Sequence, residues 1–197
     1  MPPLLSFDEY QALAGCTASR PTQVELSAEA AGELELLIGE ITVRATRLDA
    51  LKKHLWYGKG FISTVGVKPG PSQILSGETL GLLHAAIGLA TEAGELLEEV
   101  GGVVFDGSTL DKVHASEELG DADWYLSEGA TAIGRQRSAL AAQNIAKLRV
   151  RFPQKFSVEQ ATNRDLVEER RALEEHQRPC ADGLGRAEDD LFPGDDT

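Results

Sequence analysis

The sequence is short of basic residues: 19 lysines and arginines stand against 32 aspartates and glutamates, which gives a formal net charge of −13. A general nucleic-acid-binding protein needs a basic face, so this balance argues against that class and predicts no nucleic-acid partner. An enzyme that acts on nucleotides is not excluded, because metal ions screen carboxylates from phosphates.

Cysteines and long apolar runs are scarce as well. The two cysteines, Cys16 and Cys180, lie near opposite ends of the chain, so they supply neither a metal-ligand spacing nor a disulfide framework. No run of about 18 apolar residues occurs, and the first residues lack the basic start and apolar stretch of a signal peptide. We therefore expect a cytoplasmic protein with reduced thiols and no membrane span.

Helical patterns dominate the rest of the sequence. Ser6 and Glu9 fit a capping box that opens a short first helix. The segment Glu78 to Val100 is apolar on most sides, which is typical of a central helix, and Gly101 and Gly102 are expected to end it. Further helices are expected over about 27–56, 109–133, 136–152 and 163–176. No strand pattern competes with these, so the sequence predicts an all-α helical bundle.

Three segments are expected along the chain. Residues 1–77 are expected to hold N-terminal helices and a Gly/Pro-rich loop, residues 78–177 a helical core, and residues 178–197 an acidic, disordered tail. A helix that is apolar on all sides must be buried on all sides, and the few helices of one chain are too few to bury it. We therefore expect a homo-oligomer in which partner subunits complete the core.

Two pairs of acids lie three residues apart on consecutive helices: Glu92 with Glu95, and Glu118 with Asp121. Residues at i and i+3 share a helix face, and a short connection makes the two helices antiparallel neighbours. Acids in apolar surroundings are costly unless they are paired or bound to metal, and oxygen ligands suit Mg²⁺ or Mn²⁺. The alternative is that both pairs are solvated on amphipathic helices, and the spacing alone leaves both interpretations open.

The stretch from His84 to Leu96, followed by Glu117 to Leu126, resembles the MazG-like family of all-α nucleoside triphosphate pyrophosphohydrolases. That family is marked by E-x-x-E, a gap, and E-x-x-D. Three further blocks are similar to the family, the last of them to its phage-type branch: residues 7–11, 144–156 and 163–166. The resemblance implies that the four acids hold Mg²⁺, with Mn²⁺ as a substitute, and that water cleaves (d)NTPs between the α and β phosphates. The products are a nucleoside monophosphate and pyrophosphate, and relatives are dimers or tetramers.

One block departs from the family pattern. Relatives carry a lysine-containing block just after the first acid pair, whereas residues 100–108 here contain no lysine and a similar block occupies Leu51 to Lys59. Lys53 and Lys59, beside Trp56 and Tyr57, are candidates for contacts with phosphate and base. The alternative is an ordinary surface.

Other residues are candidates for the substrate or for water. Asn144, Lys147 and Arg151 share one helical face, where they either grip phosphate or form a solvated basic face. Trp124 either stacks on a nucleobase or belongs to the core. Glu99 lies on the face of Glu92 and is the candidate that orients or deprotonates the attacking water.

His84 and His114 have no partner pattern for zinc or nucleophilic chemistry and are interpreted as structural. Two other functions stay open. One is a related pyrophosphatase that acts on another diphosphate linkage, such as that of phosphoribosyl-ATP. The other is a non-catalytic helical interaction protein.

Overall fold

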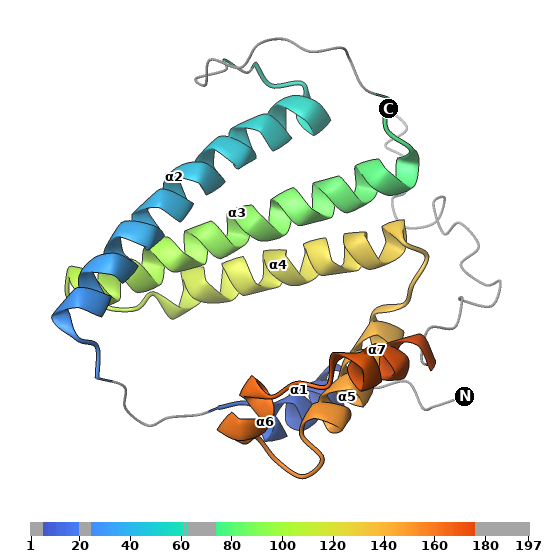
Figure 1. Ribbon diagram of the computed structural model, residues 1–197. Coiled ribbons are helices and arrows are strands. Elements are labelled where there is room, and N and C mark those ends of the chain that lie inside the picture. Colours follow the sequence, from blue (N-terminus) through green and yellow to red (C-terminus); the bar gives the residue numbers. More distant parts are fainter. Residues whose placement is uncertain (1–5, 20–24, 61, 63–73, 176–197) are drawn as a thin grey trace. The chain divides into compact units, whose positions relative to one another are not determined.

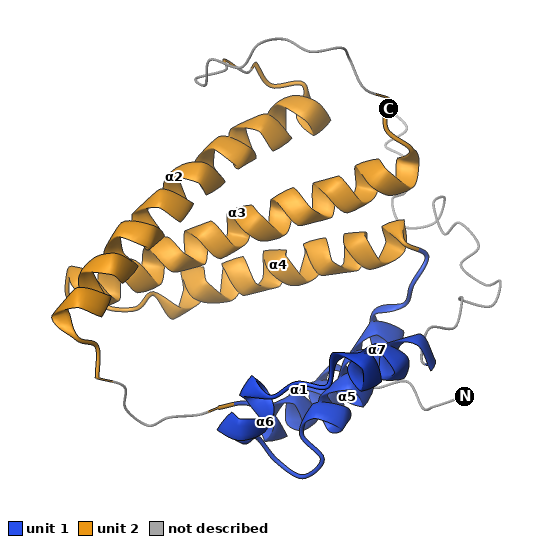
Figure 2. Ribbon diagram, viewed as in Figure 1, with its two compact units in different colours: residues 1–18, 134–197 blue, residues 19–133 orange. Residues whose placement is uncertain are grey.

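The computed structural model describes residues 6–19, 25–60, 62 and 74–175. These residues form seven α-helices and no strand, so the expected all-α class is confirmed. The chain divides into two compact units, coloured separately in Figure 2: residues 19–133, and residues 1–18 with 134–197. The expected core range 78–177 is therefore shared between the units, and the tail expected at 178–197 lies outside the described residues.

The unit of residues 19–133 is built from three long helices, α2 (Ala28–Tyr57), α3 (Gly77–Phe105) and α4 (Lys112–Ala132). The central helix α3 packs against both α2 and α4, and α3 and α4 run antiparallel (Figure 1). The side chains of Ser27, Ser76 and Asp111 cap the three helices by accepting hydrogen bonds from backbone N–H groups of the first turn.

The end of α3 was predicted wrongly. The helix does not stop at Gly101 and Gly102 but continues to Phe105, and Gly107, with φ 70°, follows. Gly101 is buried, and a Cβ atom there would lie 3.3 Å from Cγ2 of Ile38 on α2. The missing side chain therefore serves the packing of α3 on α2 rather than ending the helix.

The composition of α3 has a second consequence. By length and composition alone it is the one helix of the described residues that is long and apolar enough to cross a membrane. It also carries Glu92 and Glu95 and packs against both α2 and α4.

The contact between α2 and α3 is closest at Gly94. A Cβ atom added there would overlap Cβ of Ala45, which is fixed to the α2 backbone and cannot rotate away. We expect Gly94→Ala to lower the free energy of unfolding by about 1–3 kcal/mol, because the two helices must separate. The control is Gly120→Ala on α4, where an added Cβ meets nothing within 4 Å. Chemical denaturation of both variants tests this, and equal stability of the two would contradict the packing described.

The other unit contains α1 (Phe7–Cys16), α5 (Arg137–Arg151), α6 (Val158–Thr162) and α7 (Leu166–Glu175). Helix α1 begins with the predicted capping box of Ser6 and Glu9, and α6 was not predicted. Helix α5 contacts α1 and α7, and the side-chain amide of Gln143 donates to the carbonyl oxygen of Leu173 at 2.6 Å. Among the described residues of this unit, Ile145 and Phe152 are the large buried apolar side chains.

A buried carboxylate holds α5 and α7 together. Glu169 on α7 accepts two hydrogen bonds from Arg151 and two from Arg164, at 2.6–3.2 Å. The hydrogen bonds from Arg151 and then from Arg164 lower the pKa of Glu169 to about 2, against the opposing effect of its burial. The ionised form is therefore the one that the fold stabilises.

This carboxylate predicts a loss of stability in acid. Because the folded pKa lies below the unfolded value of 4.5, the stabilisation is complete above pH 4.5 and is lost as the pH falls towards 2. Glu169→Gln is expected to cost about 3 kcal/mol at pH 7 and much less near pH 2. Glu174→Gln, which removes an exposed ion pair with Arg170, is the control and should change stability little at either pH. Thermal unfolding followed by circular dichroism tests both, and a cost for Glu169→Gln that does not depend on pH would contradict the account.

Candidate metal site

The structure brings one acid of each predicted pair into the helical interface. Glu92 of α3 and Glu118 of α4 are 7% and 5% exposed, whereas Glu95 and Asp121, one turn further along each helix, are exposed. The interpretation of solvated acids therefore does not apply to Glu92 and Glu118. Two carboxylates buried together repel each other unless a proton or a cation lies between them.

Glu118 is the least satisfied of these groups. Its Oε1 atom lies 3.0 Å from Nε2 of His114, and its buried Oε2 atom has no hydrogen-bond partner among the described residues. Burial, the adjacent carboxylate of Glu92 and the charge of Glu95 raise the pKa of Glu118 to about 7, against the opposing charge of His114. A buried acceptor without a donor, in a group that resists ionisation, fits an adjacent cation.

Three side chains offer ligand atoms at this point. Carboxylate oxygens of Glu95 and Glu118 and a ring nitrogen of His114 all lie within 4.8 Å of one another. Burial and the charges of Glu92 and Asp49 raise the pKa of Glu95. The residues present therefore fit a divalent cation, although the group that the structure assembles contains His114 and neither Glu92 nor Asp121.

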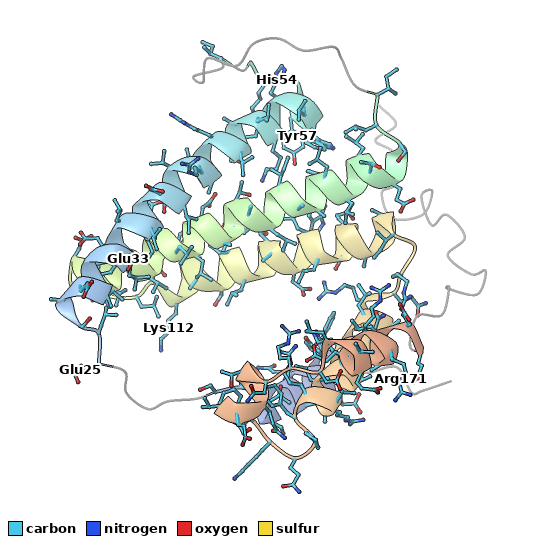
Figure 3. The ribbon with its side chains drawn as sticks, viewed as in Figure 1. Glu25, Glu33, His54, Tyr57, Lys112 and Arg171 are labelled. Carbon is cyan, nitrogen blue, oxygen red and sulfur yellow. The ribbon has the colours of Figure 1, made fainter. Side chains whose placement is uncertain are left out.

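The sequence analysis interpreted His114 as structural. Helix α4 begins at Lys112, which is labelled in Figure 3, and His114 lies in its first turn. Glu118 follows His114 by four residues. The i, i+4 spacing of His114 and Glu118 was therefore the available signal that the two side chains share a face.

A buried lysine adjoins the acids from the third helix. Lys52 of α2 is 4% exposed, and its Nζ atom lies 2.9 Å from the Tyr125 hydroxyl and 3.1 Å from Oγ1 of Thr91. The same atom lies 3.3 Å from Oδ1 of Asp49 and 3.5 Å from Oε1 of Glu92. Thr91 also donates towards Glu92 Oε1, at 3.0 Å. One positive charge thus holds the Glu92 carboxylate in a fixed place.

The ammonium of Lys52 keeps its charge despite its burial. Burial lowers its pKa, but the hydrogen bond to the Tyr125 hydroxyl, the charge of Glu92 and the hydrogen bond to Asp49 outweigh that effect and raise it. Burial raises the pKa of Asp49, yet its hydrogen bonds with Lys53 and Lys52 leave it lowered. Lys53 pairs with Asp49 from a partly exposed position. Lys52, which the sequence analysis did not choose within its lysine block, is therefore the one that reaches the acids.

Glu99 lies one turn beyond Glu95 on α3 and contacts the start of α4. Its Oε1 atom accepts a hydrogen bond from the backbone N–H of Asp111 at 2.7 Å, and its Oε2 atom lies 3.7 Å from Nδ1 of His114. His114 therefore lies between Glu99 and Glu118, within reach of both carboxylates.

An aromatic cluster adjoins the lysine. The rings of Trp56 and His84 stack at 4.4 Å, and Trp124 and Tyr125 meet His84 edge-on at 6.1 and 5.6 Å. Burial and the charge of Lys52 lower the pKa of His84, so the ring is neutral at pH 7. Trp124 remains about half exposed beside this cluster, and Lys59 is exposed beyond the end of α2.

The remaining predicted substrate contacts belong to the other unit. Asn144, Lys147 and Arg151 are partly buried on α5, and Nε and one terminal nitrogen of the Arg151 guanidinium donate hydrogen bonds to Glu169. The acids, Lys52 and the aromatic cluster belong to the unit of residues 19–133.

Comparison of the chain with protein-family models, with curated proteins and with solved structures finds no match.

Proposed function

We propose that this chain is a Mg²⁺-dependent nucleoside triphosphate pyrophosphohydrolase that cleaves (d)NTPs between the α and β phosphates. The observation that carries the proposal is the buried pair Glu92 and Glu118 on facing helices, with one Glu118 oxygen left without a donor. The spacing of the two acid pairs, which resembles that of MazG-like enzymes, supports the same reaction.

In this proposal Glu92, Glu95, Glu118 and Asp121 hold the cation, and His114, whose ring nitrogen lies within 4.8 Å of carboxylate oxygens of Glu95 and Glu118, is a further ligand. When bound, Mg²⁺ would neutralise phosphate charge and stabilise the charge that develops on the reacting oxygens. Lys52 orients the Glu92 carboxylate through its contacts with Thr91 and Glu92.

Glu99 is proposed to accept the proton of the attacking water, assisted by its neighbour His114. Within the unit of residues 19–133, substrate contacts are proposed for Lys53, Lys59 and Trp124; the contacts expected for Asn144, Lys147 and Arg151 stay predictions from the sequence. The enzyme is proposed to act in the cytoplasm. It is also proposed to be a homo-oligomer, because α3 leaves apolar side chains such as Leu82 and Val104 exposed.

The proposal predicts turnover that depends on metal. Purified protein should release pyrophosphate, rather than single phosphate, from one or more nucleoside triphosphates with Mg²⁺ or Mn²⁺, and should stop in excess EDTA because the phosphates lose their counter-charge. The panel should contain the eight common NTPs and dNTPs, and phosphoribosyl-ATP. Zn²⁺ should be included with the metals because an imidazole ligand suits it. Full turnover in EDTA, or no release from any substrate with any metal, would overturn the proposal.

A further inference from the structure

The group of ligand atoms between α3 and α4 does not consist of oxygen alone. Glu95 and Glu118 contribute carboxylate oxygens and His114 contributes a ring nitrogen, all within 4.8 Å of one another. Oxygen ligands suit Mg²⁺, whereas an imidazole nitrogen suits first-row transition ions such as Zn²⁺. The chemistry of the group therefore bears on which ion the site prefers.

Glu118 supplies a second observation that points to a cation. Its side chain is 5% exposed, and its Oε2 atom has no hydrogen-bond partner among the described residues. Its Oε1 atom lies 3.0 Å from Nε2 of His114, so this carboxylate meets the ring at one oxygen. A buried carboxylate is costly unless its oxygens are satisfied. The His114 side chain is 41% exposed, so an ion from solvent can reach the group past the ring.

The other ring nitrogen of His114 faces a fixed carboxylate. Oε2 of Glu99 lies 3.7 Å from Nδ1, and Oε1 of the same carboxylate accepts the backbone N–H of Asp111 at 2.7 Å. A histidine that binds a metal usually donates its second N–H to a carboxylate, which fixes the ring and leaves the first nitrogen free as a ligand. With the ring proton on Nδ1, the lone pair of Nε2 points towards Glu118. This contact does not depend on the proposed role of Glu99 towards the attacking water.

Lys52 reduces the share of oxygen in the site further. Its Nζ atom lies 3.5 Å from Oε1 of Glu92, and the Thr91 hydroxyl lies 3.0 Å from the same oxygen. One of the two Glu92 oxygens is therefore directed to an ammonium, which offsets the charge of that carboxylate. A neutral imidazole and a carboxylate offset by lysine attract a hard cation less than four free carboxylates would.

We propose that His114 binds the metal through Nε2 and makes the site prefer a first-row transition ion, such as Co²⁺ or Zn²⁺, over Mg²⁺. Glu99 is the positioning residue that orients the ring. The inference rests on the metal site of the proposed function and names the class of ion which that site selects. Transition ions differ in affinity at most nitrogen and oxygen sites. The dependence of the preference on His114 is therefore the property to measure.

Isothermal titration of the metal-free full chain with Co²⁺ and with Mg²⁺ tests the preference. Loss of an outer partner of a ligand costs 10–100-fold in affinity, so His114→Gln should weaken Co²⁺ binding by roughly 10-fold or more. Mg²⁺ binding should weaken much less, because the oxygen ligands remain. His54→Gln makes the same change at an exposed position near the end of α2, labelled in Figure 3, and should alter neither affinity.

The titration separates the inference from the proposed reaction. Equal weakening of Co²⁺ and Mg²⁺ binding by a folded His114→Gln variant would overturn the inference, and pyrophosphate release with Mg²⁺ could still stand. A selective loss of Co²⁺ binding in a protein that releases no pyrophosphate with any metal would support the inference and overturn the reaction.

A spectroscopic test uses the wild-type sequence and so does not depend on the folding of a variant. Pulsed electron paramagnetic resonance of the Mn²⁺-loaded protein should show coupling to a directly bound nitrogen, and labelling the histidines with ¹⁵N should change that coupling. His54→Gln should retain the signal. Mn²⁺ bound without any coupling to a histidine nitrogen, or no Mn²⁺ bound at all, would overturn the inference.

Discussion

Glu118→Gln is expected to reduce pyrophosphate release by roughly 100-fold or more and to raise the melting temperature of the metal-free protein at pH 8. Activity falls because the substitution removes one negative charge from the group that holds the cation. Stability rises because the glutamate is destabilising when ionised: burial and neighbouring acids raise its folded pKa to about 7, above the unfolded value of 4.5. Above pH 4.5 the unfolded state loses its proton first, so the penalty on the folded state grows as the pH rises and is complete above about pH 7.

The pH dependence separates this explanation from others. Glutamine cannot ionise, so the gain in stability should be absent near pH 4.5 and should reach about 3 kcal/mol above pH 7. Glu117→Gln is the matched control: it makes the same chemical change one residue earlier, at an exposed position. It should leave both activity and stability close to the wild type. A Glu118→Gln variant that retained near-wild-type turnover would remove the proposed site.

Lys52→Met is expected to have the largest effect on folding, a loss of about 3–5 kcal/mol from the free energy of unfolding. Methionine fills a similar volume, but it leaves the buried Glu92 carboxylate and Asp49 without the ammonium between them. It also leaves the Tyr125 hydroxyl and Thr91 without a shared partner. Turnover should fall as well, because the orientation of Glu92 depends on these contacts.

Lys53→Met provides the comparison for Lys52→Met. Lys53 is the next residue on α2 and pairs with the same Asp49, but its side chain is 43% exposed. Such a pair contributes little, so the loss should be below about 1 kcal/mol. Urea denaturation of the two variants measures the difference. Similar losses in both would mean that burial of the Lys52 ammonium is not what makes it important.

Much of the fold was predictable because it depends on local patterns. The helical spacing of apolar residues gave the positions of the long helices, and Ser6 with Glu9 gave the start of α1. The acid pairs could be placed on neighbouring helices because a helix of that length followed by a short connection must turn back. Gly101 was misjudged because a glycine ends a helix only when no neighbouring helix requires close approach, and Ile38 is such a neighbour.

The candidate site was predictable in part. The spacing predicts that Glu92 and Glu118 lie on facing helices. Their burial depends on how α3 packs against its neighbours, and spacing along the sequence does not predict that packing. Lys52 could not be chosen over Lys53, because the two differ only in their angle around α2, and the direction of α3 from α2 decides which is buried. His114 joins Glu118 through an i, i+4 spacing that also occurs in ordinary exposed ion pairs.

Isothermal titration of the metal-free protein with Mg²⁺ tests the central claim most directly. The proposed site predicts binding by the wild type and by Glu117→Gln, and its loss in Glu118→Gln, while circular dichroism shows all three folded. The same result is expected with Mn²⁺. Binding of Mg²⁺ with unchanged affinity by Glu118→Gln, or no binding by the folded wild type, would contradict the account.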